Sequence, residues 1–181
     1  MRTEEPSKNA DVRGGQPSPA VPAKPALAAY KRKLPHFQKP GRAFFITFVT
    51  HRRWVLPPEV RALVLDCIIA GHTVRFQLHA AVVMPDHAHL LLSPGVDERG
   101  DVFGLAQIMN SIKGASAHAV NRAMARKGHV WQEESFDTML RSDESIRQKA
   151  EYICANPVRA GLVSHEDEWP WTWREWVEDS R

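Results

Sequence analysis

Residues 84–92 read MPDHAHLLL, and two histidines in this stretch, His87 and His89, stand one residue apart at the start of an apolar run. The run predicts a β-strand, on which side chains one residue apart point to the same face. Both imidazoles can therefore reach one metal ion, while Ala88 packs on the other side of the strand. Neutral imidazole is the commonest metal ligand in proteins, so the pair predicts a metal site that takes a further ligand from elsewhere in the chain.

The composition is that of an ordinary globular domain, with 181 residues, 43% hydrophobic and 25% charged. The longest apolar runs are too short to span a bilayer, and the first residues lack the apolar core of a signal peptide. We therefore expect a cytoplasmic protein with no membrane partner. Two cysteines without a CxxC spacing agree with a reducing compartment.

Basic charge is concentrated at the N-terminus. Residues 1–42 hold nine Lys/Arg and three acidic residues, whereas the remaining 15 basic residues stand against 18 acidic ones. The high isoelectric point is thus only weak support for a nucleic-acid-binding face on the folded part. Residues 1–40 also carry seven of the thirteen prolines and show no helical or strand period, which predicts a disordered arm before a domain at 41–181. A solvated linker is favoured over a nucleic-acid-binding arm.

The order of predicted elements indicates an α+β fold. Strands are expected at residues 43–50, 76–84, 87–92 and 135–141, and helices at 57–70, 103–126 and from Ser142 or Asp143 to about 155. This is the ferredoxin-like split βαβ order: an antiparallel sheet with helices on one face, plus an added C-terminal helix. The second helix is expected to carry on one side the residues Leu105, Ile108, Ile112, Ala115, Ala119 and Ala123. The aromatic segment at 169–173 is expected to pack on the core rather than stack on bases.

The last predicted helix carries a second chemically suggestive group. Lys149, Tyr152 and Asn156 are three and four residues apart, so they are neighbours on one helical face. A phenol can attack a phosphodiester when a divalent cation polarises the phosphate. Two imidazoles and an amide oxygen suit Mg²⁺ or Mn²⁺, and Mn²⁺ is the better match to nitrogen.

Each of these features alone is more often structural. A His-x-His pair on a strand, a tyrosine on an amphipathic helix and an asparagine before proline all have ordinary packing or capping roles. A structural zinc site is disfavoured because no cysteine accompanies the histidines. Only the combination favours a catalytic site.

The chain resembles the single-tyrosine HUH transposases. The stretch 84–91 is similar to their HUH motif, and the blocks at 131–137, 152–163 and 169–171 resemble the REP-associated branch (RAYTs), so that the resemblance covers about residues 43–173. It implies a metal-dependent single-stranded DNA endonuclease and strand transferase that acts at REP-type hairpins through a 5′-phosphotyrosine intermediate. Tyr152 would be the nucleophile, and His87, His89 and Asn156 would bind the metal.

Two positions depart from the pattern of the family. Ala88 is smaller than the bulky apolar residue that usually stands between the histidines. We expect this difference to affect packing only. Phe136 stands where some relatives have tyrosine, which leaves Tyr152 as the candidate nucleophile.

The resemblance also implies hairpin DNA as the partner, a monomer, and association with the nucleoid. Contacts to phosphate are expected from basic side chains, although each could be simply solvated: Arg52, Arg53, Lys113, Arg122 and Lys149. The alternative function is a catalytically silent, domesticated binder of structured DNA or RNA.

Overall fold

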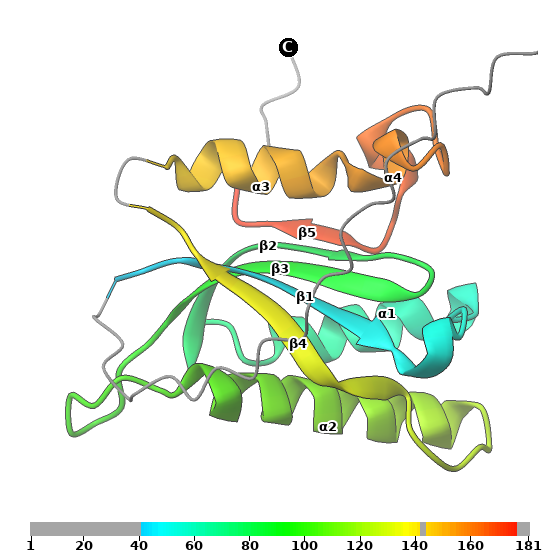
Figure 1. The fold of residues 1–181 in the computed structure, drawn as a ribbon, viewed down its shortest axis with the longest axis horizontal. Coiled ribbons are helices and arrows are strands. Elements are labelled where there is room, and N and C mark those ends of the chain that lie inside the picture. The colour runs from blue at the N-terminus through cyan, green and yellow to red at the C-terminus, as the bar shows by residue number, and fades with distance from the viewer. Residues whose placement is uncertain (1–40, 142–143, 177–181) are drawn as a thin grey trace, which may run out of the picture. The chain divides into compact units, whose positions relative to one another are not determined.

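The computed structural model describes residues 41–141 and 144–176. Within these residues, five strands form one antiparallel sheet in the order β4-β1-β3-β2-β5 (Figure 1). The strands are β1 (Phe44–Thr50), β2 (Phe76–Val83), β3 (His87–Pro94), β4 (Trp131–Met139) and β5 (Thr172–Arg174). The helices are η1 (His51–Arg53), α1 (Pro58–Ile69), α2 (Leu105–Ala123), α3 (Ile146–Cys154), α4 (Asn156–Arg159) and η2 (Glu166–Glu168). The predicted ferredoxin-like α+β fold with an added helix is confirmed.

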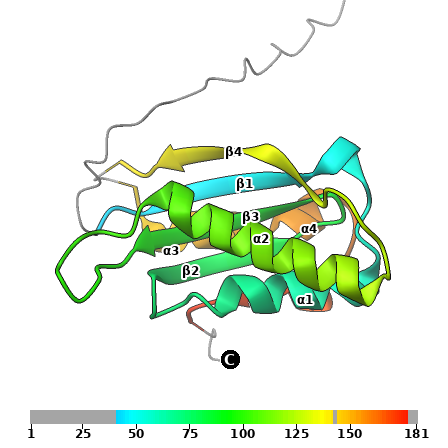
Figure 2. The ribbon, with the colours of Figure 1, turned by 90° about the horizontal axis from the view of Figure 1, so that it is seen from below.

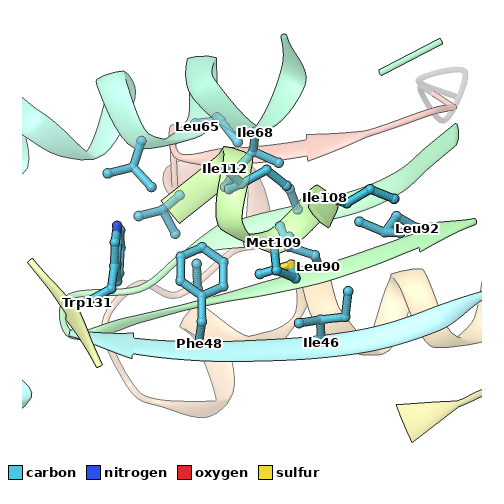
Figure 3. Packing of buried hydrophobic residues seen from close by; sticks show 14 of the residues in the cluster. Ile46, Phe48, Leu65, Ile68, Leu90, Leu92, Ile108, Met109, Ile112 and Trp131 are labelled. Carbon is cyan, nitrogen blue, oxygen red and sulfur yellow. The ribbon is translucent and has the colours of Figure 1, made fainter. Parts of the chain in front are cut away.

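Strand alternation divides the core into two layers. Leu90 and Leu92 of β3 join a cluster with α1 and α2, in which Phe48 of β1 also lies (Figure 3). Leu91, between them, belongs instead to the cluster under α3. Because successive side chains on a strand point to opposite faces, His87 and His89 share the face of Leu91. The histidine pair therefore lies on the α3 side of the sheet.

Helices α1 and α2 cover the opposite face (Figure 2). The buried residues of α2 are Leu105, Ile108, Met109, Ile112, Ser116 and Val120. Of the six residues predicted on one side of this helix, the first three are buried, Ala119 is half-buried, and Ala115 and Ala123 are exposed. The reason is tertiary: Trp131 of β4 donates from Nε1 to the Ser116 hydroxyl at 2.9 Å, which brings the Ser116 side of the helix into the core.

The boundaries of two elements also differ from expectation. Strand β4 begins at Trp131, four residues before the predicted start, because its backbone already pairs with Thr50 of β1. The N-cap of α3 is Ser145, whose hydroxyl accepts from the Gln148 amide at 3.3 Å, whereas the predicted caps at 142 and 143 lie outside the described residues. Helix α3 ends at Cys154, and the chain turns into the short helix α4.

The C-terminal aromatic segment packs as predicted and adds a strand. Trp169 is buried and donates from its indole nitrogen to the Val83 carbonyl at 3.0 Å. Residues 172–174 then pair with β2 as β5, which the sequence did not predict. No helix in the described part of the chain is long and apolar enough to cross a membrane. The predicted arm lies outside the described residues, so the division at residue 40 stays a prediction.

Candidate active site

The imidazoles of His87 and His89 face each other across a short distance. Their Nε2 atoms are 3.1 Å apart. The Nδ1 atom of His87 lies 2.6 Å from Oδ1 of Asp86, and the Nδ1 atom of His89 lies 2.8 Å from the hydroxyl oxygen of Thr47. Partners on both Nδ1 atoms fix the orientation of the rings and leave the two Nε2 atoms for a shared ligand.

The tautomers that these partners favour suit a cation. A carboxylate only accepts hydrogen bonds, so neutral His87 donates from Nδ1 to Asp86 and keeps a lone pair on Nε2. If the Thr47 hydroxyl accepts from His89 in the same way, two lone pairs meet at 3.1 Å. Such lone pairs repel unless a proton or a cation lies between them. The histidine pair therefore fits a metal ion chemically.

His89 is held in the neutral form that binds metal. Burial, the positive charge that His87 carries when it is protonated, and the charge of Arg159 together lower its pKa from 6.5 to about 3. The Phe45 ring stacks on the imidazole with centroids 5.5 Å apart, which contributes to that burial. At neutral pH, no proton competes with a cation for this nitrogen.

Asp86 is itself held by a second cation, Arg53. Nη1 of Arg53 donates to Oδ2 of Asp86 at 3.1 Å. Burial acts to raise the pKa of Asp86, but the hydrogen bonds and charges of His87 and Arg53 outweigh it, so the pKa lies below its ordinary value. Arg52 and Arg53 both adopt left-handed backbone angles, with φ of 54° and 57°. Both side chains are exposed, and Arg53 is the one that contacts Asp86.

Helix α3 presents the predicted nucleophile on its open side. Tyr152 is 53% exposed. The ammonium nitrogen of Lys149 lies 5.4 Å from the Tyr152 ring centroid and 4.9 Å from that of Phe45. Lys149 and Tyr152 are thus neighbours, as the helical spacing predicted. Since Phe45 stacks on His89, these contacts link α3 to the histidine pair.

Asn156 lies outside α3, as the first residue of α4. Its Oδ1 accepts a hydrogen bond from Nη2 of Arg159, and its Nδ2 is buried without a partner in the described part of the chain. The guanidinium of Arg159 also lies 3.8 Å from the Tyr152 ring centroid. Arg159 was missed at the sequence level, although positions 152, 156 and 159 have helical i, i+4, i+7 spacing.

Two of the predicted DNA contacts lie elsewhere. Lys113 and Arg122 belong to α2, on the other face of the sheet. Nζ of Lys113 donates to the Glu133 carbonyl at 2.7 Å, and burial lowers its pKa. The structure therefore brings Arg53 and Lys149 to the site but not these two residues.

Within residues 41–141 and 144–176, no charged or thiol side chain joins the histidine pair as a third metal ligand. Among the residues that the structure describes, no three His, Cys, Asp or Glu side chains form a group that could hold a metal. An amide is then the natural complement to the histidine pair. Asn156, with an unpartnered buried Nδ2 and a single contact at Oδ1, has unused hydrogen-bonding capacity.

The sheet carries the paired imidazoles on one face, and the exposed tyrosine of α3 is linked to them through Lys149 and Phe45. The family model described as "Transposase IS200 like" matches residues 43–156, more than half of the chain. The chain therefore belongs to the IS200-like transposase family.

Similar proteins confirm the resemblance to the REP-associated branch. A REP-associated tyrosine transposase of Escherichia coli (strain K12) is 26% identical over 147 residues, which cover 81% of this chain and 82% of that protein. A provisionally named REP-associated tyrosine transposase of Haemophilus influenzae is 26% identical over 102 residues, 54% of this chain and 58% of that protein.

A solved structure agrees with the fold. The structure of a REP-associated tyrosine transposase bound to a REP hairpin has a TM-score of 0.56 and 22% identity, and the match covers 78% of this chain and 81% of that chain.

Proposed function

We propose that this protein is a metal-dependent nickase and strand transferase for single-stranded, hairpin-forming DNA, with Tyr152 as the nucleophile. The observation that carries the proposal is an exposed tyrosine whose ring contacts the cationic groups of Lys149 and Arg159, on a helix that Lys149 and Phe45 link to two imidazoles with converging Nε2 atoms. Hairpin DNA as the substrate rests on the relatives, one of which is described as bound to a REP hairpin.

The residues of the site fit the roles that phosphoryl transfer requires. His87, His89 and Asn156 would hold Mg²⁺ or Mn²⁺, which when bound would polarise the scissile phosphate. The cationic groups of Lys149 and Arg159 both contact the Tyr152 ring and would stabilise the charge that develops on the phosphate oxygens.

Cleavage forms one bond and breaks one. The phenolic oxygen of Tyr152 attacks phosphorus and gives up its proton to solvent, while the bond from phosphorus to the 3′ oxygen breaks. The 3′ oxygen takes up a proton from solvent and leaves as a hydroxyl, and the 5′ phosphate stays on the tyrosine. Because a phosphodiester is exchanged for a phosphotyrosine, a 3′ hydroxyl can reverse the step without ATP.

A gel assay tests the proposal. Purified full-length protein, incubated with Mn²⁺ and a labelled single-stranded DNA that contains a REP-type hairpin, should form a covalent adduct that survives denaturation. Tyr152→Phe should abolish the adduct, and Tyr30→Phe, the matched control at the chain's other tyrosine, should not. An adduct that persists in Tyr152→Phe would refute the role of Tyr152. A different result would instead indicate a catalytically silent DNA binder. In that case the protein would form no adduct, and its hairpin binding would weaken with salt but would not change with metal or with His87→Ala.

A further inference from the structure

Arg159 contacts both the proposed nucleophile and the proposed amide ligand. Its guanidinium carbon lies 3.8 Å from the Tyr152 ring centroid, close enough for a cation–π interaction. From the same group, Nη2 donates to Oδ1 of Asn156. One side chain thus fixes the ring of the nucleophile and occupies the oxygen that a metal would use.

The local backbone explains this position. Ala155 keeps helical angles, with φ −73° and ψ −3°, but α3 ends before it and α4 starts with Asn156 and Pro157. Pro157 is buried and has no N–H, which suits the first turn of a helix. Arg159 is the last residue of α4, seven residues after Tyr152, so its long side chain can return over the phenol ring.

The charge of Arg159 lies next to the oxygen that would bind the cation. Its Nη2 contacts Oδ1 of Asn156, so a divalent ion bound to that oxygen would meet the positive guanidinium at close range. A fixed positive charge at this range opposes the binding of a divalent ion.

Resting on the proposed function, we propose that Arg159 stands in for the metal before DNA binds. In the DNA-free protein it holds the Tyr152 ring and the Asn156 oxygen and weakens metal binding. A scissile phosphate, which guanidinium binds well, would draw Arg159 away from Asn156 and free that oxygen for the cation. DNA and metal would then bind cooperatively, and the nucleophile would meet a complete site only with substrate present.

Removing the charge of Arg159 should change Mn²⁺ affinity and the rate of adduct formation in opposite directions. Arg159→Met removes the charge but keeps an apolar stem against the ring. It should bind Mn²⁺ on the order of tenfold more tightly in the absence of DNA, because both the repulsion and the competition for Asn156 are lost. It should also form the covalent adduct roughly 10-fold to 10²-fold more slowly at saturating Mn²⁺, because the phenol is less well positioned. If Arg159 only stabilised the fold, Arg159→Met would weaken Mn²⁺ binding and also slow adduct formation.

The experiment measures Mn²⁺ affinity of the full-length, DNA-free protein from the electron paramagnetic resonance signal of free Mn²⁺, beside the rate of adduct formation. Arg159→Lys keeps a positive charge without the planar fork and should keep weak Mn²⁺ binding, with slowed adduct formation. Arg159→Gln is a second neutral variant should Arg159→Met fold poorly, and thermal unfolding monitors folding. Arg147→Met is the matched control, since this exposed α3 arginine pairs with Glu151, and both readouts should stay unchanged.

Two outcomes are distinguishable. Unchanged or weaker Mn²⁺ binding by folded Arg159→Met and Arg159→Gln would overturn the role of Arg159 while leaving the proposed nickase intact. Mn²⁺ binding that His87→Ala does not reduce would show that the ion binds elsewhere. That result would overturn the proposed metal site, and the role of Arg159 with it.

Discussion

The hydroxyl oxygen of Thr47 lies 2.8 Å from Nδ1 of His89, although the two residues are 42 positions apart in the chain. The pairing of β1 with β3 places them directly opposite each other on the α3 face. A threonine inside a buried strand thereby orients an imidazole through the nitrogen that a metal would not use. Such outer partners matter because they fix the ring and its tautomer.

Replacing Thr47 with valine should weaken metal binding while preserving the fold. The two side chains have similar shape, but valine offers no partner to His89 Nδ1. We expect a 10-fold to 10²-fold loss of Mn²⁺ affinity, the usual cost of losing a partner of a ligating histidine. Thr138→Val, on the exposed edge strand β4, is the control and should bind Mn²⁺ normally. Equal affinities of Thr47→Val and the wild type would contradict the role of this hydroxyl.

Asp86 and Arg53 should act on the metal site as one unit. Asp86→Asn keeps the shape of the side chain but removes the negative charge of the group that accepts the hydrogen bond from His87. It should weaken Mn²⁺ binding about 10-fold. Arg53→Gln should have a smaller effect, because it acts only through Asp86.

A double-mutant cycle checks this coupling. In the Asp86→Asn background, Arg53→Gln should cause little further loss of Mn²⁺ affinity. Arg52→Gln changes the exposed neighbour and serves as the control. Additive losses from the two substitutions would show that Arg53 does not act through Asp86.

The metal-free protein should lose stability in acid because of His89. Its pKa is about 3 in the folded protein and near 6.5 when unfolded, so below pH 6.5 the unfolded chain takes up a proton that the folded site refuses. The free energy of unfolding should therefore fall between pH 6.5 and about 3, by up to roughly 1.4 kcal/mol per pH unit from this group.

Urea unfolding in EDTA across this pH range measures the effect. His89→Phe should flatten the pH dependence, since phenylalanine takes up no proton. His118→Gln alters an exposed histidine of α2 and should leave the slope unchanged. A slope in His89→Phe equal to that of the wild type would assign the acid sensitivity to other groups, such as Asp86.

The attachment of α3 to the sheet should depend on Ile153. This side chain is fully buried in the cluster beneath α3, directly after the exposed Tyr152. Ile153→Ala should lower the free energy of unfolding by about 2–5 kcal/mol, and Ile153→Val by about 0.5–1.5 kcal/mol. Gln148→Ala, on the exposed side of α3, should change it little. Denaturant unfolding measures all three, and a loss below about 1 kcal/mol in Ile153→Ala would contradict this packing.

Hairpin binding should distinguish Lys149 from Lys113. Lys149 lies beside Tyr152, so Lys149→Gln should weaken hairpin binding. The slope of log affinity against log salt concentration should also become shallower, by the amount that one lost phosphate contact accounts for. Lys113→Gln should have little effect on either, because the Lys113 ammonium is committed to the Glu133 carbonyl on the other side of the sheet. Affinity measured from 50 to 200 mM salt checks both, and the reverse ranking would place the DNA on the α2 face.

Local periodicity determined the parts of this protein that lie within one element. The alternation of a strand was enough to put His87 and His89 on one face, and the spacing of a helix was enough to make Lys149 and Tyr152 neighbours. The order of the elements was enough for the ferredoxin-like fold. These properties depend only on the backbone repeat, which the sequence pattern reports directly.

Tertiary structure alone decided which distant side chains complete the site. Strand register brought Thr47 and Phe45 to His89, and the break after α3 directed Arg159 to Tyr152 and Asn156. Packing against Trp131 likewise buries Ser116 of α2, while its neighbour Ala115 stays exposed. Register and helix rotation are set by how two faces fill the space between them, a property of pairs of elements that no single segment encodes.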